Sequence, residues 1–172
     1  MIEKSTRGSR FLLHFALFLS LASLFLIIAC SKQNAKAQIE KRGIPYSQDS
    51  FLFQVSRGDK DIVALFLKAG MDVNASDQHG HTALMIASYM GHTNLAKFLL
   101  EKGANINARS NEGDTALMEA IYSGHNDTVQ LLIEKGADVN ARSNGGLSPL
   151  MLAGAVGNPE VADALRKAGA RQ

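Results

Sequence analysis

A 33-residue repeat constrains the fold of this chain more than any other feature of its sequence. A small residue, a leucine, an alanine and a glycine stand at Thr82, Leu84, Ala87 and Gly91, and the same four types recur in register at each of the next two steps of 33 residues. A fixed period held at many positions is the signature of a repeat protein, in which each unit buries its apolar face against the next. The sequence therefore predicts a stack of like units.

Each unit carries the start and stop signals of two short helices. A hydroxyl side chain stands where an N-cap is expected, at Thr82, Thr115 and Ser148, the last followed by a proline at the first helical position. Glycines suited to helix ends follow the first helices at Gly91, Gly124 and Gly157, and the second helices at Gly70, Gly103, Gly136 and Gly169. Helices of about ten residues are not stable alone in water, so stacking must stabilise them.

The pattern resembles the ankyrin repeat, whose unit is two short antiparallel helices and a β-turn or hairpin connection. The resemblance covers residues 45–172 and implies an all-α repeat solenoid of four stacked helix-turn-helix repeats, at about 45–75, 76–109, 110–142 and 143–172. One departure is systematic, because the histidine that usually follows the leucine of the family signature is replaced by Met85, Met118 and Met151.

The first and last repeats are expected to act as caps. Gln54 takes the position that is alanine in the other repeats, and a polar residue there would keep the open face of the first repeat soluble. Arg166 stands where Leu100 and Ile133 stand in the preceding repeats. The outer face of the last repeat is therefore expected to be polar.

The N-terminal residues indicate a targeting segment. Residues 1–10 are polar and basic, and residues 11–29 contain no charge. The run ends in Ile27-Ile28-Ala29-Cys30, which resembles the bacterial lipobox and implies that residues 1–29 are a signal peptide and that Cys30 becomes the lipid-modified (palmitate-bearing) first residue of the mature chain. An uncleaved transmembrane anchor and a soluble secreted product remain alternatives.

Cys30 is the single cysteine of the chain and so cannot form an internal disulfide, which agrees with lipidation. Ser31 resembles the residue found in lipoproteins sent to the outer rather than the inner membrane, and this implies a periplasmic or surface-facing location in the cell envelope. Residues 30–44 show no apolar periodicity and are expected to be a flexible polar tether.

Composition and motifs argue against a nucleic-acid partner and against a catalytic site. Outside the first thirty residues the basic and acidic residues are equal in number, which does not suit a phosphate backbone. His92 and His125 recur at one repeat position and are expected to belong to the scaffold, while His79 and His81 lack a third metal ligand. No phosphate-binding loop is present, and Asp114 and Glu119 are interpreted as solvated acids rather than a general acid and base. We therefore expect no enzyme activity, no cofactor and no bound metal.

A protein partner is the remaining expectation. In ankyrin repeats the turn tips and the exposed flank of the first helices hold partners, and these positions map here to Gln78, His79, His81, Tyr89, Met90, Asn111, Glu112, Asp114, Tyr122, Ser123, Asn144, Gly145, Leu147, Ala155 and Val156. Tyr89 and Tyr122 lie one period apart and are either interface anchors or packing residues of the first-helix layer. The resemblance thus implies a monomeric, membrane-tethered scaffold or assembly factor, with an inhibitor or immunity-type protein as the alternative.

Overall fold

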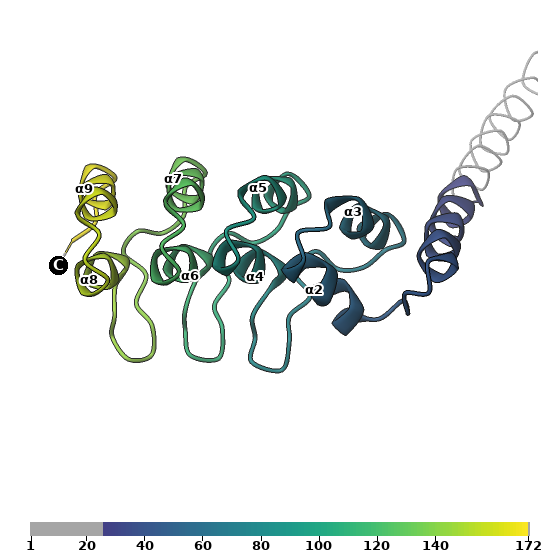
Figure 1. Ribbon diagram of the computed structural model, residues 1–172, viewed down its shortest axis with the longest axis horizontal. Coiled ribbons are helices and arrows are strands. Elements are labelled where there is room, and N and C mark those ends of the chain that lie inside the picture. The colour runs from purple at the N-terminus through teal and green to yellow at the C-terminus, as the bar shows by residue number, and fades with distance from the viewer. Residues whose placement is uncertain (1–25, 172) are drawn as a thin grey trace, which may run out of the picture.

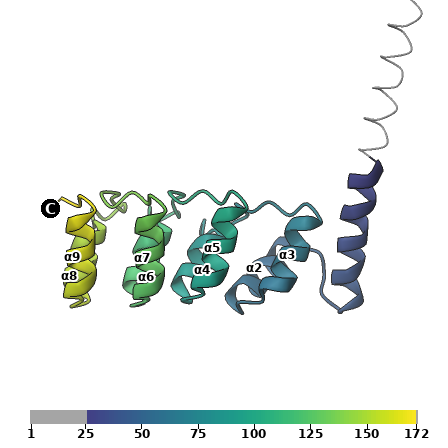
Figure 2. The same ribbon diagram turned by 90° about the horizontal axis from the view of Figure 1, so that it is seen from above.

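The computed structural model describes residues 26–171 and arranges them as two rows of helices (Figure 1). The first helices of the repeats form one row, made of α2 (Gln48–Ser56), α4 (Ala83–Tyr89), α6 (Ala116–Tyr122) and α8 (Pro149–Ala155). The second helices form the other row, made of α3 (Lys60–Lys68), α5 (Thr93–Glu101), α7 (Asn126–Glu134) and α9 (Pro159–Lys167). Seen from above, the helix pairs stand side by side along the array (Figure 2). The expected all-α repeat solenoid is confirmed.

The helices begin and end where the sequence signals them. Side-chain oxygens of Thr82, Thr115 and Ser148 each accept a hydrogen bond from the backbone amide three residues on, which satisfies one of the free amides of a helix N-terminus. Gly91 and Gly103 have positive φ, 71° and 90°, after the first and second helices of the second repeat. Local sequence therefore sets the length of each helix.

Stacking buries the same positions in repeat after repeat. Leu84, Leu117 and Leu150 from the first helices are buried in one continuous core, together with Leu99, Leu132 and Leu165 from the second helices. Burying a leucine side chain contributes about 1.5–3 kcal/mol. Because the helices of neighbouring repeats pack against each other, this burial stabilises helices of seven to nine residues that would not persist alone.

Hairpin-like connections join consecutive repeats and project from one edge of the array (Figure 1). The backbone amides of Asp77, Ser110 and Ser143 donate to the carbonyls of His81, Asp114 and Leu147, at 3.1, 2.9 and 3.0 Å. Within the described residues there is no regular strand, and β pairing is limited to the Ser76–Thr82 bridge. The connections therefore close as tight turns and do not extend into a sheet.

Residues 31–41 are not the flexible tether expected from composition. Residues 26–41 form a helix, here called the N-terminal helix, in which Ala35 and Ile39 are buried and Ile39 joins the main core. The ammonium group of Lys36 lies 5.3 Å from the centre of the Tyr46 ring, and that ring stacks on Phe66 of α3. Two buried apolar residues are sufficient to hold this helix in place, because the first repeat supplies the surface that they cover.

The two ends of the stack differ, because this helix covers the N-terminal end alone. The N-terminal end is covered, and Gln54, expected on an open face, is buried at 8% exposure. At the C-terminal end Arg166 is exposed and pairs with Asp163, which fits a polar outer face on α9. On α8, however, Met151 is 43% exposed although the equivalent Met85 and Met118 are buried, because no further repeat packs against it in the described structure.

The expected signal peptide lies largely outside the described residues, since the structure describes the chain only from residue 26. Across residues 26–171, none of the helices combines the length and the apolar character needed to cross a bilayer. Cys30 is a free cysteine whose side chain is exposed on the N-terminal helix.

Candidate functional site

Exposed large apolar side chains lie along the first helices of the repeat array. Among the described residues after the N-terminal helix, all of them lie on a first helix or within two residues of one. We call this set the first-helix surface, and it consists of Phe53, Tyr89, Met90, Tyr122, Leu147, Met151 and Val156. The period accounts for part of this set, because Tyr122 lies one step of 33 residues after Tyr89 and Val156 lies two steps after Met90. Contiguous exposed apolar patches on a folded protein mark interaction sites.

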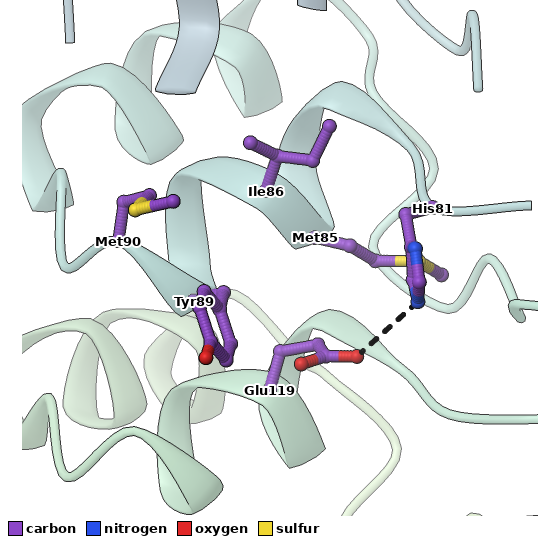
Figure 3. Close-up of a pocket in the computed structure, with 6 residues that line it drawn as sticks. All are labelled: His81, Met85, Ile86, Tyr89, Met90 and Glu119. Atoms are coloured by element: carbon purple, nitrogen blue, oxygen red, sulfur yellow. Dashed lines mark ion pairs between the residues drawn. The ribbon is translucent and has the colours of Figure 1, made fainter. Parts of the chain in front are cut away.

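The centre of this surface is hollowed between α4 and α6. A pocket of about 320 Å³ is lined by His81, Met85, Ile86, Tyr89, Met90 and Glu119. Figure 3 shows Tyr89 and Glu119 side by side along one wall, with His81 at one end and Met90 at the other. A second hollow of about 280 Å³ shares Tyr89 and Glu119 and extends toward Tyr122 and Leu147. Tyr89 and Glu119 therefore separate two adjoining cavities.

Three ionisable groups form a chain along the edge of the pocket. Nδ1 of His81 lies 3.2 Å from Oδ2 of Asp77, and Nε2 of His81 lies 3.9 Å from Oε1 of Glu119 (Figure 3). Burial raises the pKa of Glu119 above its usual value; His81 opposes this, while Asp114 and Glu112 add to it. Burial also raises the pKa of Asp77, but hydrogen bonds from the His81 amide and ring and from the His79 amide outweigh it, so the net shift is downward.

Glu119 is a site residue that sequence reasoning missed, and its interpretation as a solvated acid was wrong. Its side chain is only 16% exposed. Steps of 33 residues align Glu119 with Phe53, Ile86 and Leu152, so one carboxylate interrupts an otherwise apolar row. That alignment is the signal that could have identified it. Asp114 is half-buried, and its pKa is raised by burial and by Glu112 against the effects of His81 and Arg109.

The turn tips are linked to one another, and this gives two of the expected contact residues a structural role. The side-chain amide of Asn111 donates to the Gln78 carbonyl at 3.1 Å, and that of Asn144 donates to the Asn111 carbonyl at 2.8 Å. The Asn144 backbone amide also donates to the carbonyl of Glu112. Asn111 and Asn144 therefore hold consecutive tips in register, and their side-chain amide groups are already engaged.

The other expected contact residues are distributed along the same edge. At the tips, Gln78, His79, Glu112 and Gly145 are exposed. The Ser123 hydroxyl is half-buried and donates to the Glu119 carbonyl at 2.9 Å. Ala155 and Val156 are exposed at the end of α8. The structure thus places the candidates on one flank, with Tyr89, Met90 and Tyr122 nearest the hollowed centre.

His92 and His125 lie outside this flank and serve the scaffold. Nε2 of His92 lies 2.9 Å from the Ser56 carbonyl of the preceding repeat, and the His125 ring lies close against Gly91. This confirms the expected scaffold role of His92 and His125. The rings of His79 and His81 have centroids 6.0 Å apart, and residues 26–171 contain no group of three or more His, Cys, Asp or Glu side chains placed to hold a metal ion.

Comparison with protein families agrees with this geometry. A family model described as ankyrin repeats (3 copies) matches residues 13–110 and 107–172, which together span most of the chain. No curated protein matches the chain. Ankyrin repeats indicate a protein–protein interaction module, in agreement with an exposed flank of apolar and aromatic side chains. The chain therefore belongs to the ankyrin-repeat family.

Proposed function

We propose that this chain is a monomeric, membrane-tethered scaffold or assembly factor of the bacterial cell envelope, and that it docks a protein partner on the first-helix surface. One observation carries the docking site: in the described repeats, large apolar side chains are exposed along the first helices, and α3, α5, α7 and α9 expose none. Tyrosine is enriched among residues that dominate binding energy, and Tyr89 and Tyr122 are 44% and 66% exposed.

In-cell photo-crosslinking tests the docking site. A crosslinking amino acid at position 122 on α6 should capture a discrete partner, whereas one at position 130, an exposed glutamine on α7, should not. Equal capture from both positions would move the docking site away from the first helices. Where the captured partner is an enzyme, retained activity in the complex supports a scaffold, and loss of activity supports the inhibitor alternative.

The proposed tether rests on the lipobox-like residues that precede Cys30. Cleavage after Ala29 would make Cys30 the first residue of the mature chain and leave Ala35 and Ile39, which cover the first repeat, in place. Lipid on Cys30 would then be joined to the repeats by a helix and would hold the array close to the bilayer. Stable anchoring needs more than one acyl chain, as a modified N-terminal cysteine would carry. Ser31 favours the outer membrane over the inner one.

Substitution of Cys30 tests the tether. Cys30→Ser removes the thiol that would accept the lipid, so it should abolish incorporation of radiolabelled palmitate and leave a longer, unprocessed precursor. Ser31→Ala keeps the thiol and should retain both label and processing. If Cys30→Ser incorporates as much label as the wild type, the lipid anchor is elsewhere or absent.

A further inference from the structure

Glu119 lies in a setting that disfavours its charge. It interrupts the apolar row of Phe53, Ile86 and Leu152, its side chain is 16% exposed, and it lines both adjoining hollows. Removing a carboxylate from water costs free energy unless a counter-charge compensates. A carboxylate held at the centre of an exposed apolar surface is thus a candidate recognition element.

The compensation available inside the chain is incomplete. Among residues 26–171, His81 is the basic side chain within 4.0 Å of the Glu119 carboxylate, at 3.9 Å, and its other ring nitrogen lies closer to Asp77. Asp114 and Glu112 act on Glu119 in the opposite sense, as neighbouring negative charges. The environment of Glu119 therefore favours a further positive charge.

The walls of the hollows define which kind of cation would fit. Met85, Ile86 and Met90 line the first hollow, and Met118 and Tyr122 line the second, so apolar groups surround the carboxylate. Lysine and arginine combine an apolar stem with a charged head, and arginine can also stack its planar guanidinium on an aromatic ring. Tyr89 offers such a ring beside Glu119 (Figure 3). A purely apolar side chain would bury the carboxylate further without compensation, and an acidic one would be repelled.

We infer that the first-helix surface recognises a protein segment that inserts an arginine or lysine side chain between α4 and α6, with its charged head on Glu119 and its stem against the neighbouring methionine and tyrosine side chains. This rests on the proposed function and adds the chemistry of the partner.

A random dodecapeptide library displayed on phage tests this, with selection on the full chain held in detergent micelles. The wild type should enrich peptides that carry arginine or lysine at a common position by at least fivefold over the starting library. Glu119→Leu restores the apolar row and should lose that enrichment. Glu101→Gln, an equal change of charge at the exposed end of α5, should keep it.

An enriched peptide then provides the sharper measurement. Replacing its basic residue with citrulline, which is close in shape to arginine and uncharged, should weaken binding to the wild type at least tenfold and binding to Glu119→Gln less than twofold. Equal citrulline effects on both proteins would overturn the inference, as would a selection without basic enrichment or without any enriched peptide.

The outcomes separate this inference from the proposed function. Peptides that lose binding in Tyr89→Ala/Tyr122→Ala but show no basic preference would leave the first-helix surface in place and reject the role of Glu119. Peptides whose binding is changed neither by the tyrosine substitutions nor by substitution of Glu119 would reject both.

Discussion

Gly91 and Gly124 occupy the same position in consecutive repeats and share a left-handed backbone, with φ of 71° and 75°, but their surroundings differ. A Cβ atom built on Gly91 would lie 2.5 Å from Nδ1 of His125, whereas one built on Gly124 would meet nothing within 4 Å. The difference arises in the following repeat, which places a histidine ring over Gly91 and Asn158 at the equivalent position after Gly124.

Alanine at these two glycines should therefore have unequal effects. Both substitutions incur the cost of a left-handed L-residue, about 1–2 kcal/mol. Gly91→Ala must also displace the His125 ring, and overpacking of this kind costs about 1–3 kcal/mol more. Urea unfolding in micelles should show a lower free energy of unfolding for Gly91→Ala than for Gly124→Ala. Equal values would show that the His125 ring moves aside without cost.

The raised pKa of Glu119 predicts a pH-dependent stability with a definite sign. Between the usual glutamate pKa and the raised folded-state pKa, the folded chain binds more protons than the unfolded chain, so stability falls as pH rises through this range. Glu119→Gln removes the charge and should be more stable than the wild type at pH 7, with the difference shrinking at acid pH. The other charged groups that face Glu119 are His81, Asp114 and Glu112, and these residues are the same in the variant and in the wild type.

Thermal melts over a range of pH test this prediction, and Asp77 provides the opposite case in the same experiment. Its pKa is lowered in the fold, because hydrogen bonds from His81 and His79 outweigh the effect of burial, so its contribution is present above the unfolded pKa and is lost as pH falls through the folded pKa. Asp77→Asn should be less stable than the wild type at pH 7, and the two should converge at acid pH. Shifts of one sign for both variants would contradict the electrostatic assignment.

At the scale of the element, the N-terminal helix differs most from expectation. Ala35 and Ile39 are one helical turn apart and are nearly inaccessible, at 1% and 0% exposure. Two apolar residues in an otherwise polar segment are too few to form a periodic pattern that predicts a helix. Their burial depends on the surface of the first repeat, which no window within residues 31–44 contains.

A buried isoleucine in this helix provides the test. Ile39→Ala should lower the free energy of unfolding by about 2 kcal/mol or more, as deletion of a buried side chain does. Gln33→Ala, at an exposed position of the same helix, should change it by less than about 0.5 kcal/mol. If both variants unfold like the wild type, residues 31–41 behave in solution as the free tether that composition suggests.

The parts that could be predicted from sequence are those that local residues determine. Thr82 and Thr115 mark helix starts because an N-cap needs only its own hydroxyl and an amide three residues on, and the fixed period then gives the stacking order. The exposed tyrosines could be found by the same register. Glu119 gives no signal when it is considered as a single acid, and it stands out only when the repeats are aligned, because Ile86 and Leu152 occupy the same position in the neighbouring repeats.

At the scale of the whole molecule, different positions on the same first helices serve stability and binding. Leucines that recur at the same position of each repeat, such as Leu84 and Leu117, are buried at 1% and 0% exposure and stabilise the array. Residues displayed by the same helices, such as Tyr89 and Tyr122, remain exposed although they lie only five residues further along the chain. Stability and binding should therefore respond to different substitutions on the same two helices.

This division leads to a matched comparison on α4 and α6. Tyr89→Ala/Tyr122→Ala should keep the free energy of unfolding within about 1 kcal/mol of the wild type, because both side chains are exposed, but should lose the partner captured by a crosslinker at position 156, since anchor residues typically contribute about 2 kcal/mol or more to binding. Leu84→Ala and Leu117→Ala should each lower stability by about 2–5 kcal/mol and lose capture only as the folded protein is lost. Retained capture by the tyrosine variant at normal protein level would place the partner on the turn tips or on the second-helix face, whereas a large loss of stability in that variant would mean that the tyrosines belong to the core.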